Sequence, residues 1–144
     1  MAHTHAEEDM IAIVDLEAEL SKLTMLQKRT PTTTRAEREG SSAQLAAYRD
    51  GHLFTSKFAG KGAWERHPNG DELVHVIDGA GVLQVVTAEG TRSIDVKAGM
   101  LVVVPQGAWH RFHSAEGVTL MTATPQPSEH VRADVDDPTT AGPQ

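Results

Sequence analysis

Glycine residues divide the middle of this chain into short segments of nearly equal length. Ten of the twelve glycines lie between Gly51 and Gly117, so that a turn signal recurs about every 8–11 residues. The runs between them are apolar, or alternate between apolar and polar residues, as in LVHVI, VLQVV and MLVVV. Short strands separated by regularly spaced turns are typical of a β-sandwich or a β-barrel. We therefore expect an all-β core from about residue 43 to residue 124.

The two ends of the chain differ from this core in composition. The first 40 residues hold 13 charged residues and a single glycine. Leu16, Leu20 and Leu23 recur at helical spacing, and Asp15 stands where an N-cap residue would stand. We predict an N-terminal arm, residues 1–42, that contains a short helix and packs on the barrel or on a partner. Residues 125–144 carry four prolines, and we expect this Pro-rich tail to wrap the surface or fray.

Composition excludes several classes of protein. The 144 residues suffice for about one domain, and the absence of cysteine rules out disulfides, thiolate zinc sites and cysteine nucleophiles. A formal net charge of −7 argues against nucleic-acid binding and against docking on anionic lipid. No apolar run approaches the ~20 residues of a membrane span, and the N-terminus lacks the pattern of a secretory signal. We expect a cytoplasmic protein with neither nucleic-acid nor membrane partners.

Histidines and carboxylates gather at one point of the predicted core. Glu65 and His67 are two residues apart, so they share one face of a strand. A turn around Asn69-Gly70 follows, and Glu72 opens the next strand. These three side chains can converge on one ion. A second cluster, which ends in His110, follows about 30 residues later as one strand gives way to the next.

The order and spacing of these residues resemble the two motifs of the cupin superfamily. In the first motif Glu65 replaces the first histidine, and the leading glycine is only loosely matched by Gly60 or Gly62. In the second motif Ser114 replaces the terminal asparagine. The positions that match are His67, Glu72 and Gly79 in the first motif, and Gly99, Pro105, Gly107 and His110 in the second.

This resemblance implies a small single-domain cupin, a jelly-roll barrel or double-stranded β-helix, with one divalent metal inside. Carried over by position, the ligands are Glu65, His67, Glu72 and His110. Two imidazoles and two carboxylates suit Fe, Mn, Zn, Ni or Co without selecting one of them. Alternatively, His67, Glu72 and His110 form a triad with open positions, and Glu65 acts beside the metal as a catalytic general acid or base.

Three functions are compatible with such a chain. The first is a metal-dependent enzyme that acts on a small polar organic molecule, as a dioxygenase, isomerase, lyase or hydrolase. The second is a non-catalytic module that senses a small molecule or a metal. The third is a relative whose site is vestigial. The fold alone does not choose among them, because one fold hosts many functions.

Strand alternation assigns the remaining histidines and several apolar residues to other places. His75 and His113 should face outward, and four further histidines lie in arm, turn or tail, where we expect no role: His3, His5, His52 and His130. The outward-facing apolar residues are Trp64, Leu73, Ile77 and Trp109, and Met100–Val104 is apolar on both faces. Such a surface usually marks an interface. We expect a second subunit, the N-terminal segment, or both to cover it, and predict a homodimer.

Overall fold

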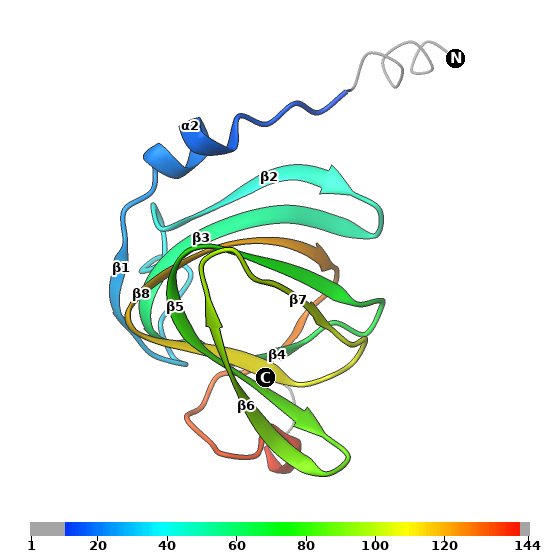
Figure 1. Cartoon of the computed structure of the whole chain (residues 1–144). Coiled ribbons are helices and arrows are strands. Elements are labelled where there is room, and N and C mark those ends of the chain that lie inside the picture. Colours follow the sequence, from blue (N-terminus) through cyan, green and yellow to red (C-terminus); the bar gives the residue numbers. More distant parts are fainter. Residues whose placement is uncertain (1–10, 142–144) are drawn as a thin grey trace.

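The computed structural model describes residues 11–141 as one nine-stranded sheet that curls into a jelly-roll barrel (Figure 1). The all-β prediction is therefore confirmed. In chain order the elements are α2 (Leu16–Ser21), β1 (Leu26–Arg29), β2 (Ser42–Tyr48), β3 (Gly51–Lys61), β4 (Trp64–Arg66), β5 (Glu72–Thr87), β6 (Gly90–Lys97), β7 (Leu101–Val104), β8 (His110–Pro125), β9 (Glu129–Val131) and the 3-10 helix η1 (Pro138–Thr140).

Two long strands, β5 and β8, join the parts of the barrel. β8 pairs with β3 along most of its length and with β4 at its first residue, where His110 lies opposite Glu65. β5 pairs with β8, β6 and β7. Because β5 begins at Glu72 and β8 begins at His110, the loops before both strands lie next to the residues that the sequence singles out.

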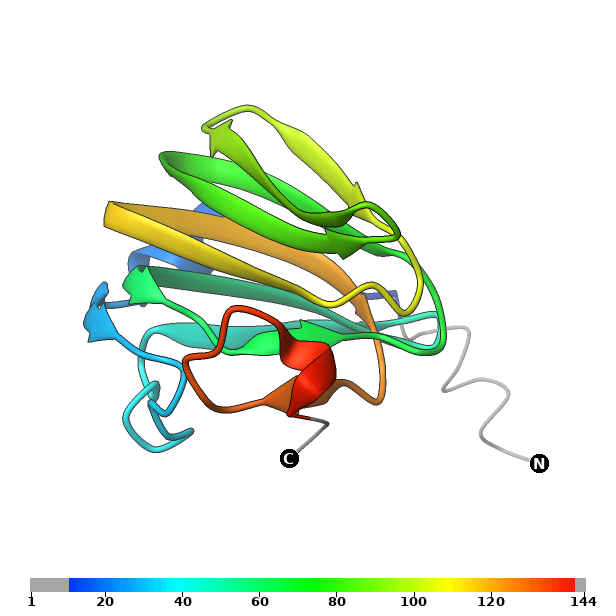
Figure 2. The ribbon, with the colours of Figure 1, turned by 90° about the horizontal axis from the view of Figure 1, so that it is seen from below.

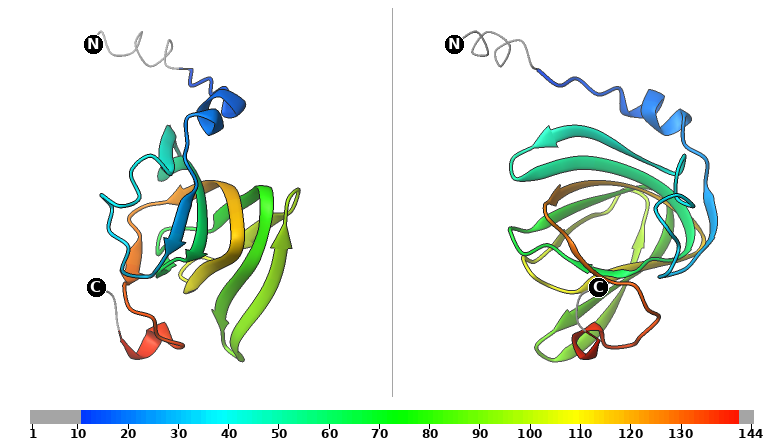
Figure 3. Two further views of the ribbon diagram at one scale, coloured as in Figure 1. Left: turned by 90° about the vertical axis from the view of Figure 1, so that its left-hand side faces the viewer. Right: turned by 180° about the vertical axis from the view of Figure 1, so that it is seen from behind.

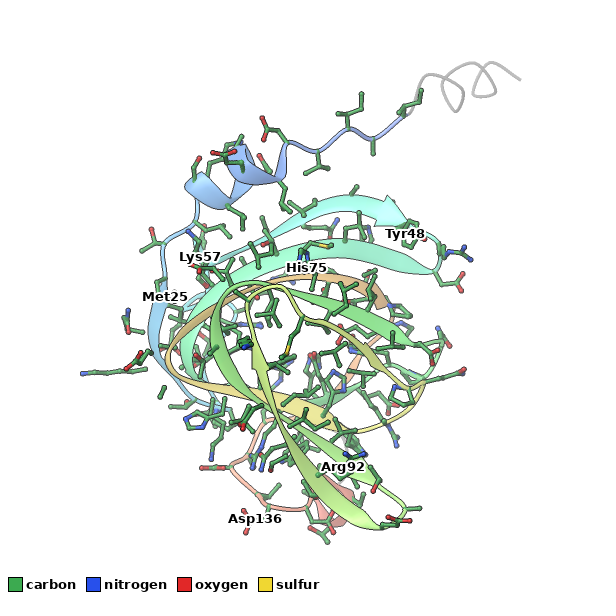
Figure 4. The ribbon with its side chains drawn as sticks, in the orientation of Figure 1. Met25, Tyr48, Lys57, His75, Arg92 and Asp136 are labelled. Atoms are coloured by element: carbon green, nitrogen blue, oxygen red, sulfur yellow. The ribbon has the colours of Figure 1, made fainter. Side chains whose placement is uncertain are left out.

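The interior of the barrel is filled by side chains (Figure 4). Phe58, Val74, Val76, Leu83 and Leu120 are among the buried residues that form the main hydrophobic core. They come from three different strands, and each is at most 3% exposed. Burial of apolar surface of this kind is the dominant stabilising contribution to a fold. The labelled side chains of Tyr48 and Arg92 lie outside the barrel (Figure 4).

The N-terminal helix forms as predicted but buries none of its residues. Asp15 caps it, because its carboxylate accepts a hydrogen bond from the Ala18 backbone N–H. The helix stands off from the barrel (Figure 3). No helix within residues 11–141 is long and apolar enough to cross a membrane.

β1 was not expected from the sequence, since its four residues carry no strand pattern. It pairs in parallel with β3, with Leu26 opposite Phe58 and Arg29 opposite Gly60. Gly60 has φ +113°, and a Cβ at this position would lie 2.3 Å from the Arg29 carbonyl oxygen. The approach of β1 to the barrel therefore requires glycine at position 60, for the backbone angle and for the space.

The two tryptophans point out of the barrel, as strand alternation predicts. The prediction of which part of the protein packs over them was wrong. Trp64 and Trp109 pack with Val131, and Trp64 donates a hydrogen bond to the Val135 carbonyl. β9 and the segment that follows it therefore cover the two tryptophans, in place of the expected second subunit or N-terminal segment, and β9 runs alongside β4 (Figure 2). Leu101 and Val103 of the outer β7 face remain 66% and 61% exposed.

The close approach of β1 makes a prediction about stability. Gly60→Ala should destabilise the protein by more than Gly90→Ala. Both glycines have a positive φ, which costs alanine on the order of 1–3 kcal/mol, but a Cβ at Gly90 has nothing within 4 Å. Urea denaturation of both variants measures the difference. Equal losses of stability would contradict the packing of β1 against Gly60.

Candidate metal centre

Three side chains from one short segment and a fourth from a distant strand meet inside the barrel. Glu65 lies on β4, His67 follows that strand, and Glu72 and His110 are the first residues of β5 and β8. One nitrogen or carboxylate oxygen from each lies within 4.8 Å of the others. The structure thus brings together the four residues that the cupin resemblance singles out as ligands.

The imidazole Nε2 atoms face the carboxylates. His110 Nε2 is 3.1 Å from Glu72 Oε1, and His67 Nε2 is 3.2 Å from Glu72 Oε2. Glu65 Oε1 is farther away, at 3.5 Å from His110 Nε2 and 3.7 Å from His67 Nε2. The His67 Nε2 atom is buried and has no hydrogen-bond partner. Glu65 is the only one of the four that is substantially accessible, with 34% of its side chain exposed.

Each of the three buried side chains is oriented by a contact behind it. His110 Nδ1 donates to the Ala108 carbonyl at 3.0 Å, and His67 Nδ1 bonds with the Ser128 hydroxyl at 2.8 Å. Thr124 donates to Glu72 Oε2 at 2.6 Å. Contacts of this kind fix the ring orientation of metal-binding histidines and leave the other nitrogen for the ion.

Comparison with known proteins agrees with this geometry. A cupin-domain family model matches residues 53–123, a range that contains all four side chains. The chain belongs to the cupin superfamily. A crystal structure of a cupin-2 domain protein from Shewanella frigidimarina NCIMB 400 resembles this cupin with a TM-score of 0.57 and 21% identity, over 79% of this chain and 95% of that one. This likeness shows the fold.

Two curated relatives share part of the sequence. The acireductone dioxygenase of Rhodopseudomonas palustris (strain TIE-1) is 36% identical over 63 residues, which is 44% of this chain and 36% of the relative. The acireductone dioxygenase of Sulfurihydrogenibium sp. (strain YO3AOP1) is 42% identical over 52 residues, or 36% of this chain and 29% of the relative. This cupin therefore spans about a third of the length of the curated relatives that it matches.

Charge is balanced within the centre of the metal-free cupin. Burial alone would lower the pKa of His110, but hydrogen bonds with Glu65 and Glu72 outweigh it and raise this pKa to about 10. Burial would likewise lower the pKa of His67, but the nearby carboxylates of Glu65 and Glu72 raise it to about 9. Burial would raise the pKa of Glu65, but its contacts with His110, His130 and His67 hold it well below its usual range. Two imidazolium and two carboxylate groups thus compensate each other.

The donor set fits a divalent metal ion. Two carboxylates and two neutral imidazoles would neutralise a 2+ charge, as two protons do in the metal-free centre. The unpartnered, buried Nε2 of His67 is the atom that gains a partner when an ion is present. Nitrogen and oxygen donors without sulfur suit Fe, Mn, Zn, Ni or Co.

Sequence reasoning missed His130, for which it predicted no role. Its Nε2 is 3.4 Å from Glu65 Oε2, because β9 pairs with β4 and sets His130 opposite Glu65. Ser128 was missed for the same reason. No pattern in the sequence indicates this pairing, since a three-residue strand after two prolines is too short to show the alternation of a strand.

The other histidines of the described chain lie outside the cluster. His75, His113 and His52 are not part of it, and His52 bonds with Gln126 instead. His3 and His5 lie outside the described residues. Ser114, which replaces the asparagine of the second motif, is buried and donates to the Ala80 carbonyl. Its contacts are those of a turn residue.

The raised histidine pKa values predict how stability depends on pH. Both values exceed the unfolded value of 6.5, so their stabilisation is complete below about pH 6.5 and is lost as pH rises toward 9 and 10. For the metal-free cupin we expect a loss of several kcal/mol between pH 6.5 and pH 10, because one pKa unit corresponds to about 1.4 kcal/mol. Chemical denaturation across this range measures it.

His110→Gln is the control for this prediction, because it lacks one of the two titrating imidazoles and should show a smaller loss. Calorimetry of metal uptake at pH 7 provides a second measurement, since the ion must displace protons from His67 and His110. A stability that rises with pH in the metal-free protein would contradict the assigned charges.

Proposed function

We propose that this protein is a cytoplasmic, metal-dependent cupin enzyme that binds one divalent ion through Glu65, His67, Glu72 and His110 and acts on a small polar organic molecule. The observation that carries the proposal is the convergence of one ligand atom from each of these four side chains, all within 4.8 Å of one another, with three of the side chains buried. The His67 Nε2 atom contacts Glu72 without hydrogen-bonding geometry, and a bound ion would give this buried nitrogen a directed partner.

Among the reaction classes, the dioxygenase class has the best support. The curated relatives with 36% and 42% identity are both acireductone dioxygenases. A bound metal would supply either Lewis acidity or, if it is iron, reaction with O2. The chain itself would hold the substrate beside the three buried ligands. It would also exclude water from the side of these ligands that faces the barrel interior.

Glu65 has a different place from the other three ligands. One of its oxygens faces the imidazoles, and the other contacts His130. Its longer distances and its exposure distinguish it from the three buried side chains that would hold the ion. We propose that Glu65 would be the most exposed of the four residues around a bound ion and would act as a general base toward the substrate, with His130 as its hydrogen-bond partner.

Elemental analysis tests the metal site. Wild type purified without chelator should contain about one equivalent of transition metal, and His110→Ala should lose it, because one of two imidazole donors is gone. His75→Ala is the matched control, since His75 lies outside the cluster. Full metal content in folded His110→Ala would overturn the proposed site.

Oxygen consumption tests the reaction. With iron bound and an acireductone as the trial substrate, Glu65→Gln should keep the metal but lose turnover by about 100-fold or more if the carboxylate accepts a proton. Loss of the metal instead would identify Glu65 as an indispensable ligand. Saturable binding of a small molecule by wild type with no product would favour a sensor over an enzyme.

We further propose that the protein is a homodimer. Two apolar surfaces stay uncovered in the described chain: the outer β7 face, with Leu101 and Val103, and the arm before α2, with Ile11 and Ile13 at 77% and 89% exposure. A second copy offers both surfaces at once, so the arm of each subunit can cover the β7 face of the other and bury both.

Light scattering after size-exclusion chromatography tests this assembly. Leu101→Ser with Val103→Ser should convert a dimer to a monomer and leave the metal content unchanged. Tyr48→Ser removes an apolar side chain that is 47% exposed on another edge and should leave the dimer intact. A monomeric wild type would contradict the proposal.

A further inference from the structure

A cationic cavity opens next to the metal centre. It has a volume of about 20 Å³, and its wall includes Arg29, Arg38, Arg132, Glu65 and His130. A space of this size holds about one water molecule or one similarly small group. Arg29 comes from β1 and Arg38 from the loop that follows it, while His130 and Arg132 come from β9 and the residue after it.

Positive charge exceeds negative charge around this cavity. Arg29 and Arg38 line it together with one carboxylate, Glu65, which is already shared among His67, His110 and His130. Within residues 11–141 no carboxylate oxygen lies within 4.0 Å of a guanidinium nitrogen of Arg29 or Arg38. The Arg38 Nε atom is buried without a hydrogen-bond partner. Both arginines are half-buried, and a small anion in the cavity would meet two charged donors at once.

Packing holds Arg29 in this position. Its guanidinium lies over the Phe58 ring, 4.5 Å from the centroid, and beside Gly62, where a Cβ would be 3.5 Å from it. Burial lowers the pKa of Arg29 to about 10; the Glu65 charge opposes this shift, and the Arg38 charge adds to it. The group stays charged at neutral pH, and the parallel pairing of β1 with β3 keeps it at the barrel.

The cavity and the metal centre share a wall. Glu65 Oε1 faces His67 and His110, whereas Oε2 faces His130, which lines the cavity. An anion held by the arginines would therefore lie beside Glu65, and the rest of the molecule could reach the metal-binding side chains.

We propose that this cavity is a carboxylate subsite and that the substrate of this cupin is a small organic acid, whose carboxylate is held by Arg29 and Arg38 while its reacting part lies at the metal centre. Only the placement of the reacting part at the metal centre rests on the proposed function. Arginine pairs with a planar carboxylate through two parallel hydrogen bonds, and the small cavity suits that group better than a tetrahedral phosphate.

Calorimetric titration tests the subsite with sodium acetate as the probe, on metal-free and zinc-loaded wild type at low ionic strength. Saturable acetate binding should weaken by about tenfold or more in Arg29→Gln and in Arg38→Gln, because each removes a charged donor. Arg92→Gln, on β6 and outside the barrel, is the matched control and should bind acetate as wild type does. Metal content should stay the same in all three variants.

The outcomes separate this proposal from the proposed function. Equal acetate affinity in the arginine variants and in Arg92→Gln would overturn the subsite, and so would binding of inorganic phosphate in preference to acetate. Acetate binding that depends on Arg38 in a protein that takes up no metal would leave the subsite standing and overturn the metal-dependent function. Arg38 lies on a loop, so its variant remains informative if Arg29→Gln fails to fold.

Discussion

Charge compensation in a buried space is the constraint on which this structure depends. Glu72 and His110 are almost completely buried, and neither could remain ionised there without the other. β5 and β8 are antiparallel, with Leu73 opposite Ala123 and Val85 opposite His110, so Glu72 and His110 lie at opposite ends of this pairing and meet only because the sheet curls into a barrel. The same pairing sets Thr124 beside Glu72, where its hydroxyl donates to the carboxylate, while the Ala108 carbonyl lies behind His110.

The parts of the fold and site that were predictable from sequence depend on local spacing. Turn glycines and alternating runs indicate the strands, and the intervals from His67 to Glu72 and from Gly99 to His110 indicate the convergence of ligands. The alternation also placed Trp64 on the outer face correctly. In each case the information lies within one hairpin or one turn, and a single sequence carries it.

The parts that were not predictable come from pairing between distant short segments. β9 has three residues, and only its register with β4 brings His130 to Glu65 and Val131 to Trp64. β1 has four residues, and its approach depends on the absence of a side chain at Gly60. Neither strand has enough residues to show the alternation of apolar and polar side chains that indicates a strand. The residues added in this way, among them Arg29 and Ser128, lie outside the segment 53–123 that is common to the family.

The C-terminal cover has a consequence for how the protein matures. All four candidate ligands leave the ribosome before residues 128–135, which orient His67 and bury Trp64. Until that segment arrives, the imidazole of His67 can rotate and the tryptophan surface is open to other proteins. A nascent chain can therefore form most of its barrel before His67 is held in place, so the candidate metal centre is completed only when the C-terminal segment has docked.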